Sequence, residues 1–375
     1  MQLIDIIYCY KNKEIARVKN SLDSLALQTN KQFSVIFIDY GSDKSYAENV
    51  KEVCDQYAFC KYYYINTLGQ MWNRADALNH GFKLSDATFV FTSDIDMIYK
   101  KTFIDYLFTF TNNEFVTLFF AVGYLNKKQT NNIDTRRLEN LKYNISKNYA
   151  LGMMFTSKKI ITQINGYNSF YAIWGVEDND IKGRIETAGL KTEFINNTIL
   201  MLHQYHTPAN NLSAGLPIGW KQYLADYHAD VKNQKTSFNG INEIFLPKKR
   251  PALNVLENKD FKIKLISSRK LFIRHSFFND ILNRDNSKII KYSIDLETHQ
   301  FQKKSTAVKF IKIVNLIFSK IKIPIDLVSM YNEQYITKKE TLDEMYFFLK
   351  SMENYIEDYC IQDFKNKITL VIIKK

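Results

Sequence analysis

Two aspartates separated by one residue follow an apolar run and could together bind a metal ion. The run Phe89–Ser93 (FVFTS) is typical of a buried β-strand, and Asp94 and Asp96 come directly after it. Carboxylates at this spacing on a turn can hold Mg²⁺ or Mn²⁺, which usually complete their coordination with water and substrate phosphate. A solvated loop at the end of the strand is the alternative for an isolated pair.

A second acidic cluster, WGVEDND, could supply a general base. It places Glu177, Asp178 and Asp180 at the start of a helix expected over 178–188. A carboxylate can take the proton of an attacking hydroxyl group, and a neighbouring acid raises its pKa by like-charge repulsion. Trp174 in the same stretch offers an apolar face for a sugar ring. The alternative is that these acids only stabilise the positive end of a helix dipole.

The elements that carry these residues follow from the spacing of apolar residues. Over the first 110 residues, short apolar runs alternate with helical 3-4-3 spacing. Strands are expected at 3–10, 33–40, 61–66 and 88–96, and helices at 15–30, 50–57 and 73–84. Repeated βαβ units predict a mostly parallel sheet with helices on both faces. Ligands bind beyond the carboxyl ends of such strands, where Asp39 would meet Asp94 and Asp96.

The chain of 375 residues is long enough for two domains, and a linker-like stretch separates them. This stretch is LPKKRPA, residues 246–252. Before it, an irregular strand pattern at 149–155 belongs to the α/β part. After it, strand patterns and a capping box of Thr341 with Glu344 at the start of a helix predict a small α+β domain.

Positive charge is concentrated in the last third of the chain. The net charge is +12, and residues 241–375 account for +9, with 25 Lys and Arg against 16 Asp and Glu. An anionic membrane surface, an acidic glycan or nucleic acid could meet this charge, but no zinc-finger spacing or RNA-binding aromatic motif favours nucleic acid. The segment 308–328 mixes apolar residues with lysines and could lie on a membrane interface, although a helix and strand with solvated lysines is the commoner arrangement.

Cysteine usage and the N-terminal residues favour a cytoplasmic protein. The four cysteines show no CxxC spacing and are interpreted as reduced thiols. The first residues, MQLIDIIYCYKNK, lack the basic region and the long apolar core of a signal peptide. No apolar run approaches the ~20 residues that span a bilayer. The expected location is therefore the cytoplasm, with peripheral association on the inner membrane face through the basic C-terminal region.

Two stretches in the first part resemble family-2 glycosyltransferases. In residues 20–45, SLALQT, a strand and IDYGSDKS are similar to that family's SLLxQT helix end and DDGSxD. Residues 66–82 (NTLGQMWNRADALNHGF) lead to the DID strand, as in that family. The resemblance implies that Asp39 contacts the nucleotide base or ribose and that Arg74 lies near the base or diphosphate.

The same resemblance implies roles for the two aspartates of the DID motif. They would face ribose, phosphate and metal, with Asp96 as the direct metal ligand and Asp94 nearer the ribose. The first strand lacks the proline that is typical near its end in this family, so Tyr8 or Tyr10 is expected to flank the base instead.

Residues 164–191 resemble the carboxyl half of galactosyltransferase-like and chondroitin-polymerase-like glycosyltransferases. Their pattern is roughly GG-aromatic, then WGxGxED(D/N)D, then Arg and Gly, and it is matched by Trp174, Gly175, Glu177, Asp178, Asp180, Arg184 and Gly189. The resemblance implies that Asp178 is the general base, that Glu177 is an acceptor-binding carboxylate beside it, and that Trp174 lines the acceptor site. Val176 stands where the family often has glycine, and this narrows the acceptor space.

A histidine after the next strand often completes the metal site in these enzymes. The stretch LMLHQYH contains His203 and His206. His203 matches the related pattern better, with His206 as the second choice, and imidazole suits Mn²⁺ better than Mg²⁺. A surface histidine or a hydrogen-bonded core histidine is the alternative for each.

Together these resemblances imply a GT-A fold, an α/β domain with a Rossmann-like, mostly parallel sheet. It would span 1–245, with a nucleotide-binding half at 1–110 and an acceptor-binding half at 111–245, before a basic α+β accessory domain at 246–375. The expected activity is an inverting transfer, with Mn²⁺ or Mg²⁺, from a UDP-sugar to a hydroxyl of a growing glycan of a bacterial capsule or surface polysaccharide.

Three alternatives stay open. One is a retaining transferase on the same fold, and another is a non-catalytic module that binds nucleotide sugar or glycan. In the third, the C-terminal domain is an independent partner-binding or oligomerising module.

Overall fold

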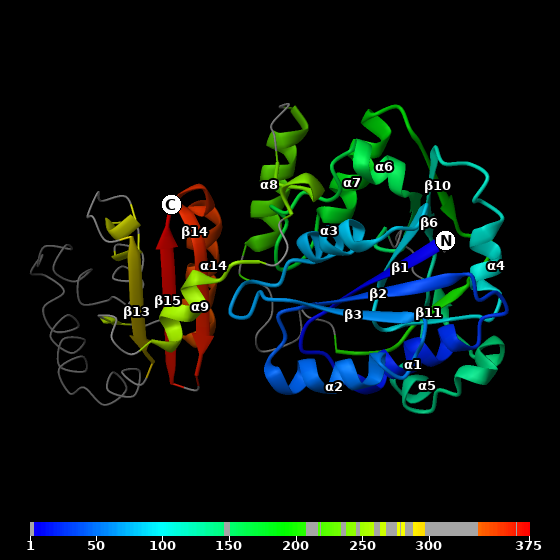
Figure 1. Cartoon of the computed structure of the whole chain (residues 1–375), viewed down its shortest axis with the longest axis horizontal. Helices are drawn as coiled ribbons and strands as arrows, with labels where there is room; N and C mark the ends of the chain where they lie inside the picture. Colours follow the sequence, from blue (N-terminus) through cyan, green and yellow to red (C-terminus); the bar gives the residue numbers. More distant parts are fainter. Residues whose placement is uncertain are drawn as a thin grey trace, which may run out of the picture. The chain divides into compact units, whose positions relative to one another are not determined.

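The computed structural model describes two compact units, Met1–Lys248 and Lys249–Lys375 (Figure 1). The residues described are 4–145, 151–207, 217, 219–233, 238–244, 248–258, 263–267, 276–277, 279–281, 288–296, 337–364 and 366–375. The catalytic and accessory roles expected for the two parts of the chain stay predictions.

A seven-stranded sheet forms the centre of the first unit, with the order β10-β6-β9-β4-β1-β2-β3. Its strands are β1 (Ile4–Tyr10), β2 (Phe33–Tyr40), β3 (Cys60–Ile65), β4 (Phe89–Asp94), β6 (Val116–Phe120), β9 (Met154–Ser157) and β10 (Lys191–Ile195). Only β9 is antiparallel to its neighbours β4 and β6. Every residue of β1 and β2 is buried, as expected for strands covered on both faces. The predicted α/β class with a mostly parallel sheet is confirmed.

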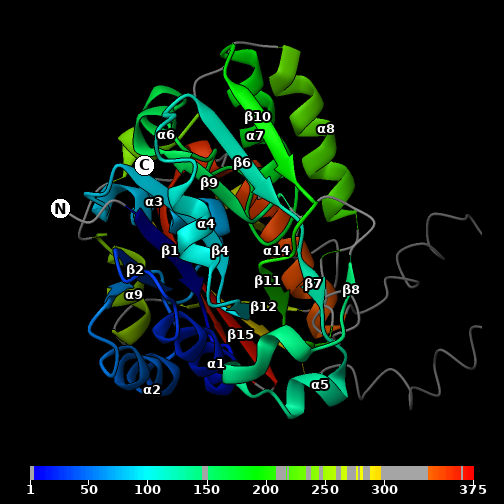
Figure 2. The same cartoon turned by 90° about the vertical axis from the view of Figure 1, so that its right-hand side faces the viewer.

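Helices cover both faces of this sheet. One apolar cluster joins the sheet to α1 (Ile15–Ala26), α2 (Lys44–Cys54) and α4 (Phe103–Phe108). The other joins it to α3 (Arg74–Leu84), α6 (Lys158–Gln163) and α7 (Glu177–Thr187), and Figure 2 shows α6 and α7 beside β9 and β10. Gly81 lets α3 approach β1 closely, because a Cβ there would meet Ile7 Cγ2 at 2.2 Å.

A second, four-stranded sheet in the same unit connects distant parts of the chain. Its order is β5-β11-β7-β8, with β5 (Met97–Tyr99), β11 (Met201–His203), β7 (Gly123–Tyr124) and β8 (Asn144–Ile145). β11 is antiparallel to β5, with His203 opposite Met97. This register sets the end of LMLH beside the end of the DID motif.

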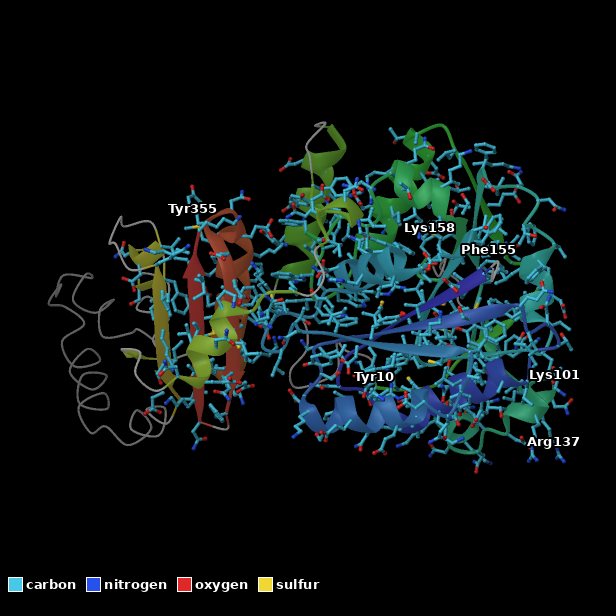
Figure 3. The ribbon with its side chains drawn as sticks, in the orientation of Figure 1. Tyr10, Lys101, Arg137, Phe155, Lys158 and Tyr355 are labelled. Carbon is cyan, nitrogen blue, oxygen red and sulfur yellow. The ribbon has the colours of Figure 1, made fainter. Side chains whose placement is uncertain are left out.

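Side chains in the interior of the first unit are buried, and those at its edge are exposed. Figure 3 shows Phe155, which is 2% exposed, within the sheet, and Lys101 and Arg137 at the edge of the unit. Two short elements, α5 (Lys127–Asn131) and the 3-10 helix Thr135–Asn140, lie along the chain after β7, and α8 (Trp220–Asn233) follows β11.

The second unit is α+β, as predicted. Its sheet has the order β12-β13-β15-β14, with β12 (Ile263–Ser267), β13 (Ile289–Asp295), β15 (Lys367–Lys374) and β14 (Ile356–Asp363). Helices α9 (Pro251–Glu257) and α14 (Lys338–Ser351) accompany it, and a buried ion pair joins Arg250 to Asp358 at 3.1 Å. The segment 308–328 lies outside the described residues, and oligomerisation through this part stays a prediction.

Several predicted boundaries are wrong. The helix expected at 50–57 begins at Lys44 and ends at Cys54, and the strand expected at 149–155 spans Met154–Ser157. α14 is capped by Thr337 with Glu340, and not by Thr341 with Glu344. Thr341 is buried one turn inside the helix, where its hydroxyl donates to the Thr337 carbonyl, so it cannot cap the free N–H groups.

Candidate functional site

A carboxylate and two imidazoles gather where the second sheet meets the DID turn. One ligand atom from each of Asp96, His203 and His206 lies within 4.8 Å of the others. Nε2 of His203 is 3.6 Å from Asp96 Oδ1, and Nε2 of His206 is 3.3 Å from Asp96 Oδ2. The pairing of β5 with β11 creates this group, because it brings the histidine segment to the turn after β4.

The residues of this metal group fit a divalent cation. Asp96 is 7% exposed, and its buried Oδ1 has no hydrogen-bond partner. Burial opposes ionisation of Asp96, but the hydrogen bond with His206 and the charge of His203 outweigh it and lower the pKa. An ionised carboxylate with an unshared oxygen beside two imidazoles is a suitable donor set for Mn²⁺ and other transition metals.

Asp94 belongs to a different group, centred on Arg74. The guanidinium of Arg74 donates from Nε to Asp94 Oδ1 at 3.1 Å and from Nη1 to Asp178 Oδ1 at 3.0 Å. Its Nη2 donates to the Gly152 carbonyl at 2.9 Å, and Glu177 Oε1 lies 3.9 Å from Nη1. The structure therefore brings both sequence motifs together through one arginine, which starts α3 after the N-cap Asn73.

Burial shapes the acid–base behaviour of this arginine group. It raises the pKa of Glu177 to about 7, with the neighbouring charge of Asp178 as the second cause. It also raises the pKa of Asp178, and Arg74 is the largest opposing influence. For Arg74 burial by itself would lower the pKa, but the charges of Asp178 and Asp94 reverse the effect. Glu177 and Asp178 therefore hold protons at higher pH than exposed carboxylates.

The loop before α7 carries backbone strain. Ile173, Gly175 and Val176 all have positive φ, at 67°, 99° and 76°. β-branched side chains rarely adopt this conformation, which costs on the order of 1–3 kcal/mol per residue. Val176 is the N-cap of α7 and has a left-handed backbone conformation. Glycine is common at this position in the enzymes that the motif resembles, and this conformation favours glycine in the present chain as well. The strained turn sets the first carboxylates of α7 against Arg74.

Trp174 lies in this loop and is 49% exposed. The ammonium group of Lys221, on α8, lies 4.4 Å from the centre of its ring system. An exposed indole three residues before Glu177 in the sequence is available to pack against a ligand.

Asp39 stands at the carboxyl end of β2, as expected, but it is fully buried. Its Oδ1 accepts the backbone N–H of Ser42 at 2.9 Å, which is the turn-forming alternative, and its Oδ2 accepts the Tyr62 hydroxyl at 2.8 Å. Burial raises its pKa, and the hydrogen bonds from Ser42 oppose this. Contact between Asp39 and a donor stays a prediction.

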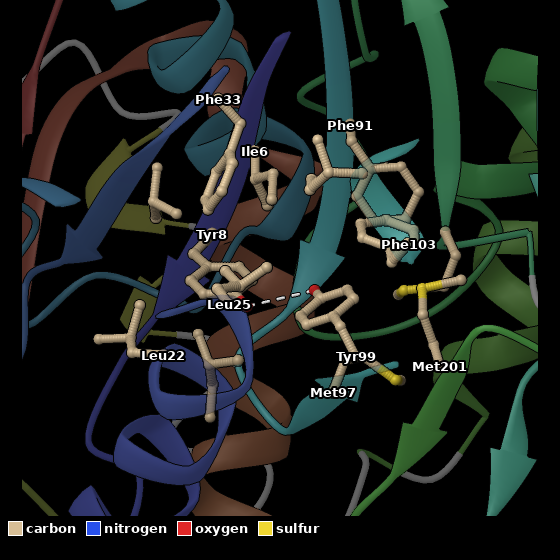
Figure 4. Close-up of a cluster of buried hydrophobic side chains, with 14 of the residues drawn as sticks. Ile6, Tyr8, Leu22, Leu25, Phe33, Phe91, Met97, Tyr99, Phe103 and Met201 are labelled. Atoms are coloured by element: carbon tan, nitrogen blue, oxygen red, sulfur yellow. Dashed lines mark hydrogen bonds between the residues drawn. The ribbon is translucent and has the colours of Figure 1, made fainter. Parts of the chain in front are cut away.

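Tyr8, which was expected to flank the base, is buried, and its contact with a donor stays a prediction. Tyr8 is 0% exposed, and its hydroxyl shares a hydrogen bond with Ser21 at 2.6 Å. It also bonds to the Tyr99 hydroxyl at 3.2 Å (Figure 4). Side chains alternate along a strand, and Tyr8 lies in the core cluster that joins the sheet to α1. Tyr10, the alternative, is also fully buried.

Comparison with known proteins supports the second motif. A family model described as the N-terminal domain of galactosyltransferase matches residues 135–207, which include Trp174, Asp178 and both histidines. This confirms the resemblance to galactosyltransferases over that part of the chain. No curated protein matches the chain.

Among solved structures, the chain is similar to GalNAc-T7 with UDP, GalNAc and Mn²⁺, at 14% identity and a TM-score of 0.45. It is also similar to S. aureus TarS 1-349 in complex with UDP-GlcNAc, at 13% identity and a TM-score of 0.47. These alignments cover 61% and 63% of this chain, and 50% and 68% of the other chains. TarS 1-349 without that ligand gives 13% identity and a TM-score of 0.41, covering 54% and 60%. The chain thus spans about half to two thirds of the length of these proteins.

Proposed function

We propose that the chain is an inverting glycosyltransferase that moves a sugar from a nucleotide-diphosphate sugar, of the UDP class, to a hydroxyl group of a glycan. The observation that carries the proposal is the position of Asp178, which Arg74 links to Asp94 of the DID motif. The family match over residues 135–207 supports the class of reaction.

Asp178 would take the proton of the acceptor hydroxyl as the oxygen attacks the anomeric carbon. Its raised pKa makes it a stronger base than an exposed aspartate, and the side chain is 26% exposed and so reachable. Glu177, beside it, would hydrogen-bond to the acceptor. Trp174 would pack its exposed face against the acceptor sugar.

Asp96, His203 and His206 would hold Mn²⁺ or Mg²⁺. The two imidazoles favour Mn²⁺, and the unpartnered buried Oδ1 of Asp96 supports a cation at this point. When bound, such an ion supplies charge stabilisation for the departing diphosphate. Asp94, which lies toward Arg74, would face the ribose side of the donor.

The setting we propose is the synthesis of a bacterial capsule or another surface polysaccharide, at the inner face of the membrane. The net charge of +9 on residues 241–375 supports binding at an anionic membrane surface. In the described part of the chain, no helix is both long and apolar enough to cross a bilayer.

A donor screen tests the proposal. The full chain is incubated with a panel of nucleotide sugars, with Mn²⁺ or with EDTA, and the release of nucleoside diphosphate is measured. Metal-dependent release from a UDP-sugar is expected. No release from any donor in the presence of metal would contradict the activity and favour a binding module. NMR of the product then gives the anomeric configuration, and retention would remove the role of Asp178 as the base.

A further inference from the structure

A cation outside the sequence motifs lies beside the metal group. Arg17, in the first turn of α1, has Nη1 at 3.9 Å from Asp96 Oδ2. This separation is too long for a hydrogen bond, and the Nε atom pairs with Glu14, whose side chain is 75% exposed. We propose that Arg17 binds the diphosphate of the donor next to the metal ion, an inference that rests on the proposed function.

The charge balance of the metal group favours a dianionic ligand. Metal binding requires neutral imidazoles, so the two histidines would add no charge. Asp96 contributes one negative charge, whereas a divalent cation and Arg17 together contribute three positive charges. Glu14, which pairs with Arg17, has a side chain that is 75% exposed, so solvent screens most of its charge. The other carboxylate of the motif, Asp94, is paired with Arg74 at 3.1 Å. A diphosphate matches the remaining excess of two positive charges better than a monoanion does.

Arg17 is held in register with the metal ligands by Gln204, which is fully buried. Nε2 of Gln204 donates to the Arg17 carbonyl at 3.0 Å and to the Asp96 carbonyl at 3.2 Å. The backbone N–H of Gln204 donates to the same Asp96 carbonyl at 3.0 Å. Because Gln204 lies between the two histidines in the sequence, one side chain fixes the start of α1, the DID turn and the histidine segment together.

A purely structural role for Arg17 makes a different prediction. If Arg17 only neutralised and positioned Asp96, its removal would weaken binding of the metal itself. If Arg17 binds the anion, its removal takes away a positive charge that repels the metal, and only the diphosphate loses a partner. The two roles are therefore separated by measuring metal and anion binding independently.

The test uses the full chain, inorganic pyrophosphate and Mn²⁺. Affinity for Mn²⁺ alone is measured by electron paramagnetic resonance, and affinity for pyrophosphate at saturating Mn²⁺ by calorimetry. For Arg17→Met we expect pyrophosphate affinity to fall about tenfold or more, since a charged hydrogen bond is lost, with Mn²⁺ affinity unchanged or higher. Orthophosphate should lose less. Arg17→Lys keeps the charge and should be intermediate.

Arg136→Met is the matched control, because Arg136 is an exposed arginine paired with Asp134, and it should change neither affinity. The proposal is wrong if Arg17→Met loses Mn²⁺ and pyrophosphate affinity in the same proportion. It is equally wrong if wild-type protein binds pyrophosphate no more tightly than the variant. If pyrophosphate binding depends on Arg17 but no nucleotide sugar is turned over, the proposed function fails and the anion site stands.

Discussion

Asp94 and Asp96 are separated by one residue, yet their side chains enter groups of opposite electrostatic character. Asp96 lies with two imidazoles and faces Arg17, in a group suited to a cation and the anion it carries. Asp94 is paired with Arg74, which also pairs with Asp178, in a group with more carboxylates than cations. The turn between β4 and β5 divides the motif. In the proposed reaction, one group serves the diphosphate and the other serves the acceptor proton.

The largest expected effect comes from breaking the group around Arg74. Asp178→Asn keeps the shape of the side chain but removes the proton acceptor, so sugar transfer should fall about 10²- to 10⁴-fold. Affinity for Mn²⁺ and pyrophosphate should be unchanged, because the metal group is intact. Transfer assays and calorimetry measure the two. Glu186→Gln, a more exposed acid on the same helix, is the control. Wild-type transfer by Asp178→Asn would contradict the assignment of the base.

Separate substitutions of the two aspartates in the DID motif test whether Asp94 and Asp96 belong to different groups. Asp96→Asn should lower Mn²⁺ affinity at least tenfold, because even the loss of a residue that only supports a metal ligand typically lowers metal affinity about tenfold or more. Asp94→Asn should leave Mn²⁺ affinity within about twofold, because Asp94 faces Arg74. Electron paramagnetic resonance measures both. Equal losses for the two variants would mean that the aspartates act as one metal site.

The raised pKa of Glu177 predicts that the stability of the folded chain depends on pH. Its ordinary value is 4.5 and its folded value about 7, so between these values the folded state binds more protons than the unfolded state. The free energy of unfolding therefore falls as pH rises through this window, by about 3 kcal/mol for this group. Glu177→Gln should remove that part of the fall.

Urea unfolding at pH 5 and pH 8 measures this difference. Glu48→Gln, at an exposed ion pair on α2, is the control and should keep the wild-type difference between the two pH values. A Glu177→Gln variant with the same pH difference as wild type would show that burial does not perturb this carboxyl group.

The smallest expected effect concerns the strained turn before α7. Val176→Gly should raise the free energy of unfolding by about 1 kcal/mol, because glycine adopts φ of 76° without strain. Val176→Ala keeps a Cβ in the same conformation and should gain less. Denaturant unfolding of both variants measures this. A destabilised Val176→Gly would show that the valine side chain packs in a way that outweighs the backbone strain.

Much of the fold could be predicted because local patterns decide it. The apolar run 33–40 coincides with β2. The helix expected to start at residue 73 is α3, and Asn73 is its N-cap. Alternating strands and helices were enough to predict the parallel sheet. The boundary failed at Thr341 because a second local capping pattern, Thr337 with Glu340, lies one turn earlier and caps α14, which leaves Thr341 buried inside the helix.

The candidate site was less predictable, because it depends on which side chains a strand turns toward it. Tyr8 looked suitable from its position near the end of β1, but the strand directs it into the core. His206 could be found from the repeated histidine in HQYH, and the sequence ranked it second. Arg17 carries no motif, so no sequence signal pointed to it.

By itself the sequence determined the chemistry that is available: paired aspartates, an acidic helix start, a tryptophan beside it and two histidines. It also determined the strands and helices that carry them, since apolar periodicity is local. Only the tertiary structure decided the partners. The pairing of β5 with β11 placed Asp96 beside the histidines and Arg17, and the packing of α3 placed Arg74 beside Asp94 and Asp178. The physical reason is that electrostatic partnership depends on distances of a few ångströms between residues far apart in the chain.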